Sequence, residues 1–144
     1  MIKLTDEMHT LVNNARDSGN PCLIATASAD GTPNTGYMGT VLSLDERSFI
    51  YRDRSGRTPL EHIEENPKVI VIFRHAQQQT GWKFRCTASV HRQGTVYEDA
   101  IKRLTDAGLI TDPEREAAIV VLQVQQVLTL FGEVLQESEQ GIGW

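Results

Sequence analysis

The sequence predicts a mainly β fold of the α+β kind, in which an antiparallel sheet of about six strands closes into a barrel or split barrel flanked by short helices. The apolar runs are short and rich in strand-forming residues, and several are joined by hairpin-length links. No repeat, low-complexity segment or linker interrupts the 144 residues. We therefore expect one domain over residues 1–144.

The chain opens with a helix and a strand. Residues 4–16 carry apolar side chains at helical spacing, and Asp6 and Glu7 suit the positive end of a helix dipole. Gly19-Asn20-Pro21 ends this helix. Residues 22–28 then form a compact apolar strand.

A hairpin follows that first strand. Ala29-Asp30-Gly31 is a turn signal, and the returning strand covers about residues 34–44. Gly36 and Gly39 inside it predict bulges, or close approach by a ligand or another backbone. Residues 48–53 form a third strand.

The middle of the chain alternates helix and strand. Thr58 is predicted to cap a helix, with Pro59 at its first position and Glu61 completing a capping box. That helix ends near Asn66-Pro67. The continuous apolar run over residues 69–73 predicts a strand buried on both faces, and residues 82–90 form another strand.

The last third contains one more helix and one long strand. Thr95 and Glu98 repeat the capping-box pattern and open a helix to about Leu104. Residues 119–131 read as a long strand rich in Val and Leu, and the acidic tail over residues 133–144 has no clear period.

Composition limits the possible partners. The net charge of −5 argues against nucleic acid, and no apolar run approaches the ~20 residues that span a bilayer. The chain shows no signal peptide, and its two cysteines, Cys22 and Cys86, form no paired motif. We expect a cytoplasmic protein that binds neither nucleic acid nor membrane.

Common catalytic motifs are absent from the sequence. It contains no phosphate loop of the nucleotide-hydrolase type, no HExxH, no GxSxG and no Cys/His cluster with metal-ligand spacing. Its four histidines, His9, His62, His75 and His91, are scattered. No catalytic residue and no metal site are predicted.

The strongest local signal is a basic segment between a strand and a helix. It contains Arg52, Arg54 and Arg57, together with the hydroxyls of Ser55 and Thr58. A helix start offers free backbone N–H groups, and arginine offers a planar fork that matches phosphate oxygens. This segment is therefore a candidate phosphate site, although the same arginines could simply face water.

Four pieces of the sequence, in order, resemble the FMN-binding split barrels related to pyridoxamine 5′-phosphate oxidase. They are IATASADGTPN at residues 24–34, GYMGT at 36–40, YRDRSGRT at 51–58 with HIEENPKV at 62–69, and GWKFRCTA at 81–88. The resemblance covers residues 4 to about 130. The family often carries Asn at the place of His62 and Gly at the place of Cys86.

The resemblance implies a six-stranded antiparallel split barrel with Greek-key topology. It also implies a homodimer that holds one FMN in each of two grooves at the subunit interface. The implied cofactor-binding residues are Met38, Gly39, Thr40 and Val41 beside the flavin, Tyr51, Arg52, Arg54, Arg57 and Thr58 at the phosphate, and Trp82, Lys83 and Arg85 along the groove.

The implied function is that of an FMN-dependent oxidoreductase whose substrate is unknown. The chain ends in Gln140-Gly141-Ile142-Gly143-Trp144 and lacks the Trp- and Arg-rich segment by which pyridoxamine phosphate oxidases hold their substrate, which argues against vitamin B6 activity. An FMN carrier or electron-transfer protein is one alternative, and a deazaflavin- or haem-binding barrel is another, with His75 or His91 as axial ligands. Trp144 reaching over a partner's flavin is a further hypothesis.

Overall fold

A computed structural model describes residues 1–54, 56–139 and 144. In these ranges the chain forms three helices and eight strands. In chain order they are α1 (Asp6–Asn13), β1 (Cys22–Ala27), β2 (Pro33–Met38), β3 (Leu42–Asp45), β4 (Ser48–Asp53), α2 (Thr58–Glu65), β5 (Lys68–His75), β6 (Thr80–His91), α3 (Thr95–Asp106), β7 (Ala118–Thr129) and β8 (Val134–Glu137).

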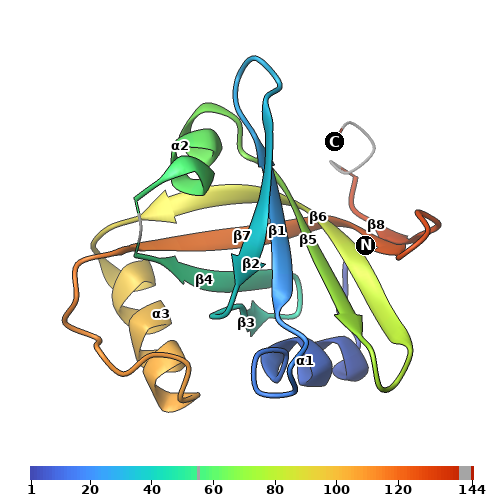
Figure 1. Cartoon of the computed structure of the whole chain (residues 1–144), viewed down its shortest axis with the longest axis horizontal. Coiled ribbons are helices and arrows are strands. Elements are labelled where there is room, and N and C mark those ends of the chain that lie inside the picture. Colours follow the sequence, from blue (N-terminus) through green and yellow to red (C-terminus); the bar gives the residue numbers. More distant parts are fainter. Residues whose placement is uncertain (55, 140–143) are drawn as a thin grey trace.

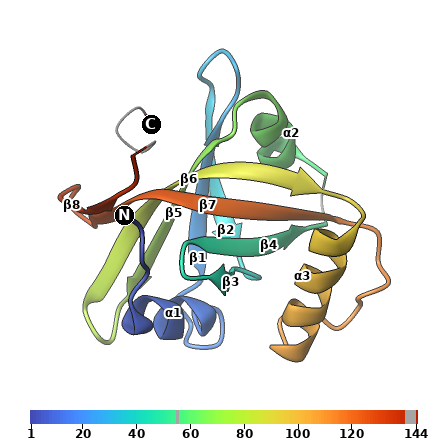
Figure 2. The ribbon, with the colours of Figure 1, turned by 180° about the vertical axis from the view of Figure 1, so that it is seen from behind.

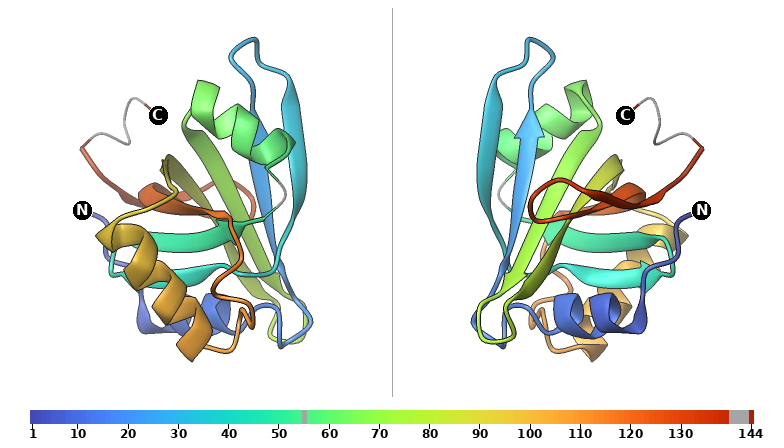
Figure 3. Two further views of the ribbon diagram at one scale, coloured as in Figure 1. Left: turned by 90° about the vertical axis from the view of Figure 1, so that its left-hand side faces the viewer. Right: turned by 90° about the vertical axis from the view of Figure 1, so that its right-hand side faces the viewer.

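All strand pairs are antiparallel, and the strands follow the order β2-β1-β5-β6-β7-β4-β3, with β8 added beside β7. The two ends of this path, β2 and β3, are joined directly by residues 39–41. The sheet therefore curls, so that β1, β2 and β5 run steeply in Figure 1 while β4 and β7 cross them. The side views in Figure 3 show these two walls with β6 reaching both. This arrangement confirms the mainly β split-barrel class.

The number of strands is eight, not the expected six. The returning strand of the first hairpin is broken, because the chain leaves β1 after Met38 and begins to pair with β4 at Leu42. The acidic tail also contains a strand, since β8 folds back on β7 and places Gln126 opposite Glu137. Neither the break between β2 and β3 nor the strand β8 has a local sequence signal, because each depends on the strand with which it pairs.

The barrel interior holds the main core. Phe49 and Phe84 meet edge to face with ring centroids 5.0 Å apart, and Phe73 stacks on Trp82 at 6.3 Å. The prediction that the apolar run of β5 is buried on both faces was wrong. Its burial alternates along the strand, and Ile70 and Ile72 are only half-buried on the outer side.

A second core cluster lies outside the barrel, between α3 and the outer face of β4 and β7. Leu104 of α3 is fully buried and clusters with Ile50 and Ile119. Burying a leucine of this kind stabilises the fold by about 1.5–3 kcal/mol. In Figure 2, α3 lies beside β4, and all six residues of that strand are buried. This packing fixes the start of the α3–β7 segment, residues 107–117, beside the end of β4.

The helix boundaries correct two predictions. Thr58 is the first helical residue of α2, with Arg57 at the cap position and no side-chain cap hydrogen bond. Gly94, at φ 94°, precedes α3, so Thr95 does not cap that helix either. In α1, Thr5 supplies the cap by accepting a hydrogen bond from the Met8 backbone N–H at 3.2 Å.

Close approach requires a glycine at Gly81, whereas the bulges predicted at Gly36 and Gly39 are not found and a Cβ on Gly36 would have no atom within 4 Å. β1 and β2 pair through six consecutive positions without a shift. A Cβ on Gly81 would lie 2.2 Å from the Phe73 carbonyl oxygen, so β5 and β6 could not keep their register with a larger residue. A Cβ on Gly39 would lie 3.4 Å from Cδ of Arg16.

None of the helices in the described part of the chain has the length and apolar character needed to span a membrane.

Candidate functional site

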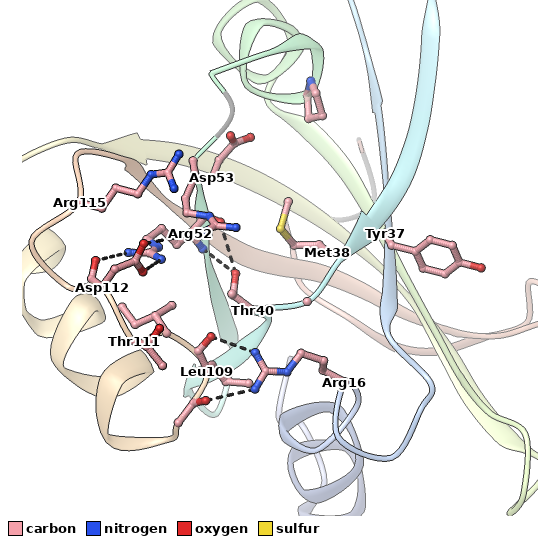
Figure 4. Close-up of a pocket in the computed structure, with 15 residues that line it drawn as sticks. Arg16, Tyr37, Met38, Thr40, Arg52, Asp53, Leu109, Thr111, Asp112 and Arg115 are labelled. Carbon is pink, nitrogen blue, oxygen red and sulfur yellow. Dashed lines mark hydrogen bonds and ion pairs between the residues drawn. The ribbon is translucent and has the colours of Figure 1, made fainter.

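A pocket of about 740 Å³ lies between the end of β2, the end of β4 and the α3–β7 segment (Figure 4). This size falls within the range of small-molecule and cofactor sites. We call it the arginine pocket because four arginines line it. Its lining residues are Arg16, Tyr37, Met38, Gly39, Thr40, Arg52, Asp53, Arg54, Pro59, Gly108, Leu109, Ile110, Thr111, Asp112 and Arg115.

The sheet side of the pocket is held by hydrogen bonds between Thr40 and Arg52. The Arg52 backbone N–H donates to Thr40 Oγ1 at 3.0 Å, and the Thr40 hydroxyl donates to the Arg52 carbonyl at 3.4 Å. The short connection after β2 is thus fixed to β4. Tyr37 belongs to the lining, but its side chain points away from the arginines in Figure 4 and is 73% exposed.

The opposite side is the α3–β7 segment, where Asp112 contacts two arginines. Arg52 Nη2 lies 2.5 Å from Asp112 Oδ1, and Arg52 Nη1 donates to the Asp112 carbonyl at 3.0 Å. Arg54 Nη1 lies 3.6 Å from Asp112 Oδ2. The hydrogen bond from Arg52, and then the charges of Arg52 and Arg54, hold the pKa of Asp112 below its ordinary value against the opposing effect of desolvation.

Arg16 ties a third part of the chain to this segment. Its guanidinium donates to the carbonyls of Leu109 at 3.0 Å and Gly108 at 3.1 Å, and its side chain passes over Gly39. Figure 4 shows these bonds at the foot of the pocket. Arg16, which follows α1, therefore contacts both the residue after β2 and the start of the α3–β7 segment.

The pocket carries a surplus of positive charge. Arg16, Arg52, Arg54 and Arg115 line it, against only two acids, Asp53 and Asp112, which leaves a formal charge of two positive units. The whole chain, by contrast, has a net charge of −5. Arg115 is exposed, and Figure 4 draws its guanidinium on the side of the pocket where β4 ends. An anionic ligand is what this charge distribution favours.

The predicted cofactor residues fall into four groups. Met38, Gly39, Thr40, Arg52 and Arg54 line the pocket together. Val41, Tyr51 and Trp82 are core residues, with 3%, 0% and 7% exposure, so their side chains pack inside the barrel. Arg57 and Thr58 are exposed at the start of α2, outside the set of described residues that line the pocket. Lys83 and Arg85 lie elsewhere, on the outer side of β6. Ser55, the other predicted hydroxyl, lies outside the described residues.

Two buried polar atoms of β4, one in the barrel core and one at the pocket, have no hydrogen-bond partner among the described residues. They are the Tyr51 hydroxyl and Nε of Arg52. Such orphaned groups are uncommon and cost free energy. Burial, followed by the charge of Asp53, raises the pKa of Tyr51, so its phenol stays protonated.

The region around Lys83 and Arg85 is a second basic site. We call it the β6 outer face, and it comprises Lys83, Arg85, Lys68 and Trp144. Arg85 donates to Gln126 Oε1 at 2.8 Å, and its guanidinium carbon lies 5.2 Å from the centre of the Trp144 ring. Lys68 Nζ lies 5.5 Å from that ring, and the Trp144 indole N–H donates to the Cys86 carbonyl at 2.9 Å.

The histidines and cysteines lie outside the pocket lining as described. His62 Nδ1 is 3.1 Å from Thr26 Oγ1, His75 accepts from the Gln78 backbone N–H at 3.2 Å, and His91 contacts Ser89. Burial raises the pKa of Cys22 to about 12 and also raises that of Cys86. Within the described ranges, no group of three or more His, Cys, Asp or Glu is placed to hold a metal.

Arg16, Asp112 and Arg115 are among the pocket residues that were not predicted from the sequence. Arg16 looks like a solvent-facing residue after a helix, and it meets partners 92 and 93 residues later in the chain. Asp112 precedes a proline and looks like a turn residue. Arg115 is the last basic residue of the chain, and nothing in its local sequence marks it as part of a site.

Comparison with known proteins gives a consistent set of relatives. A family model described as pyridoxamine 5′-phosphate oxidase matches residues 4–131. The crystal structure of HupZ from Group A Streptococcus superposes with a TM-score of 0.78 at 27% identity, covering 92% of this chain and 99% of HupZ. An uncharacterised protein of Methanocaldococcus jannaschii is 29% identical over 123 residues, which are 84% of this chain and 77% of that protein.

More distant chains share the fold alone. A proposed pyridoxamine 5′-phosphate oxidase of Lactobacillus delbrueckii has a TM-score of 0.71 at 24% identity, covering 90% of this chain and 96% of its own. An FMN-binding protein of Syntrophomonas wolfei, an F420 reductase and the heme storage protein HutZ of Vibrio cholerae each have a TM-score of 0.66, at 13–16% identity. Proteins with this fold are therefore named for three different cofactors.

Proposed function

The chain belongs to the pyridoxamine 5′-phosphate oxidase family, and from this membership we propose that it is an FMN-binding flavoprotein that acts as an oxidoreductase. The observation that carries this proposal is the charge surplus of the arginine pocket. Two uncompensated positive charges match the charge of a phosphate monoester, which is about −2 at neutral pH. The phosphate of FMN supplies both negative charges on one compact group, whereas haem carries its two negative charges on two separate propionates.

Arg54 and Arg115 are the residues we assign to the phosphate. The Arg54 side chain is 52% exposed, and its contact with Asp112 is a long 3.6 Å. Arg115 is exposed at the same pocket. Arg52 is a poorer candidate, since its side chain is only 2% exposed and two of its guanidinium nitrogens already bond Asp112.

The apolar lining suits the ring of a flavin. Met38 from the end of β2 and Leu109 and Ile110 from the α3–β7 segment line the same cavity, together with Gly39. When bound, the flavin supplies hydride or electron transfer, while the protein binds and orients it. We name no catalytic side chain, and the substrate is open.

The test is direct. The purified protein is expected to carry flavin absorbance or to bind added FMN at micromolar concentration, with quenching of flavin fluorescence. Turnover of a reduced nicotinamide with the FMN-loaded protein separates an oxidoreductase from a carrier. Absence of FMN binding at these concentrations contradicts the proposal.

A non-enzymatic FMN carrier is the second candidate, and one observation favours it. Among the described residues that line the pocket there is no His, Cys or Lys, and Asp112 is engaged by Arg52. A carrier would bind FMN, but the FMN-loaded protein would not oxidise a reduced nicotinamide.

We also propose a homodimer with FMN at the subunit interface, formed by one 144-residue domain from each copy. Lys83 and Arg85 lie on the outer side of β6 and outside the pocket lining as described, so the flavin-binding role that the family resemblance implies for them requires a groove completed by a second chain. Light scattering after size-exclusion chromatography is expected to give twice the chain mass of 16.1 kDa. A monomer that binds FMN would contradict the proposed homodimer and would leave the proposal of FMN binding in the arginine pocket intact.

A further inference from the structure

The contacts of Asp112 differ between its two carboxylate oxygens. Oδ1 lies 2.5 Å from Nη2 of Arg52, whose side chain is 2% exposed. Oδ2 lies 3.6 Å from Nη1 of Arg54, whose side chain is 52% exposed. One carboxylate thus faces both a buried, structural arginine and the arginine that we assign to the ligand.

Asp112 therefore stands where an anionic ligand would make its contact with Arg54. A carboxylate presents two acceptor oxygens to a guanidinium, as a phosphate does. We propose that Asp112 competes with the ligand's phosphate for Arg54 and so sets the affinity of the pocket for a dianion such as a phosphate monoester. This inference rests on the proposed function, because it concerns the phosphate end of the same site.

The competition requires only the Arg54 contact to break. Arg52 keeps Asp112 in place through two bonds, one of them to the backbone carbonyl at 3.0 Å. The start of the segment is held separately, since Arg16 donates to the carbonyls of Gly108 and Leu109. Replacing Asp112 by the ligand as the partner of Arg54 therefore requires only a movement of the exposed Arg54 side chain. The α3–β7 segment stays in place.

The charges in the pocket explain the preference for a dianion. Asp112 and Asp53 leave two positive charges among the four arginines. A neutral flavin gains nothing from Arg54 and does not displace the Asp112 carboxylate. A ligand with one negative charge gains no more from Arg54 than Asp112 already does. A dianion brings one charge more than Asp112 does, so it gains from Arg54 and Arg115 together.

The experiment removes the charge and keeps the shape. Asp112→Asn retains an acceptor oxygen for Arg52 and the backbone carbonyl, and it removes the competitor at Arg54. Affinities of the full chain for FMN, riboflavin and inorganic phosphate are measured by calorimetry. The matched control is Asp106→Asn, at the end of α3, where the acid pairs with Lys102 on the surface and lies outside the lining as described.

The inference predicts that Asp112→Asn tightens FMN and phosphate binding by about three- to tenfold, as expected for removing one charge several ångströms from the ligand at intermediate dielectric. Riboflavin affinity and the control variant stay at the wild-type values. Unchanged or weaker binding of FMN and phosphate by a folded Asp112→Asn protein overturns it. If that variant has lost its cooperative thermal transition, Asp112→Ser is used with the same expected and contradicting results.

The inference and the proposed function fail separately. A wild-type protein that binds phosphate but no FMN contradicts the proposed function, and tightening of phosphate by Asp112→Asn still supports the competition. A wild-type protein that binds FMN, with no tightening in the variant, contradicts the competition alone.

Discussion

The arginine pocket and the β6 outer face both present basic side chains, and they differ in how that charge is compensated. At the β6 outer face, Arg85 bonds Gln126 and lies against the Trp144 ring, and Lys68 approaches the same ring. In the pocket, four arginines meet two aspartates, and Arg54 and Arg115 stay exposed. The comparison teaches that basic residue type alone does not mark a candidate ligand site: the basic side chains of the pocket surround a cavity, whereas those of the β6 outer face pack on a tryptophan ring and a glutamine.

The largest expected effect is on ligand binding in the pocket. Replacing Arg54 and Arg115 together by Ala removes both contacts assigned to the phosphate, each worth about 1.5–3 kcal/mol for hydrogen bonds to a charged group. FMN affinity is then expected to fall at least about a hundredfold. Fluorescence titration of FMN measures the loss.

A matched double variant on exposed surface gives the control. Lys102 and Arg103 of α3 form surface ion pairs with neighbouring acids, and Arg103 also donates to the Leu44 carbonyl at 3.1 Å. Neither residue lines the pocket as described, so replacing both by Ala is expected to keep FMN affinity within about twofold. Equal losses in the two double variants would show that net charge, and not the pocket, governs binding.

A smaller effect concerns stability and distinguishes Arg52 from Arg85. Arg52→Ala removes a buried guanidinium that bonds Asp112 twice, and we expect a loss of about 2–3 kcal/mol in the free energy of unfolding. Arg85→Ala, on the half-buried outer side of β6, is expected to cost about 1 kcal/mol or less. Urea denaturation measures both, and a larger loss for Arg85→Ala would contradict this difference.

The smallest effect on FMN affinity is expected at Trp144, which lies outside the pocket lining as described. Trp144→Ala removes one hydrogen bond, to Cys86, and two cation–π contacts that are each worth about 0.5–1 kcal/mol at exposed sites. The emission spectrum is expected to lose the Trp144 component. Unchanged FMN affinity would also end the hypothesis that Trp144 reaches a partner's flavin.

Local signals predicted much of the fold. β4 was predicted with its observed limits, and the β1–β2 hairpin and the α2 helix follow from turn and proline signals close to each element. The break between β2 and β3 and the presence of β8 could not be predicted in this way. They depend on pairing with β4 and β7, which the sequence does not encode locally.

The site was predicted on one side only. The basic run after β4 stands out in the sequence, and the pocket does contain Arg52 and Arg54. The other wall was missed, because Asp112 joins Arg52 across 60 residues and Arg16 joins Leu109 across 93. Those contacts decide which arginines stay exposed, so the sequence alone could not assign the phosphate to one of them.

The most direct test of the central claim is a calorimetric comparison of FMN and riboflavin on the wild-type chain. The two ligands share the ring and differ in the phosphate. If the charge surplus of the arginine pocket holds that phosphate, FMN binds at micromolar concentration and riboflavin at least about a hundredfold more weakly, a difference of about 2.7 kcal/mol. Equal affinity for the two flavins, or binding of neither, contradicts the account.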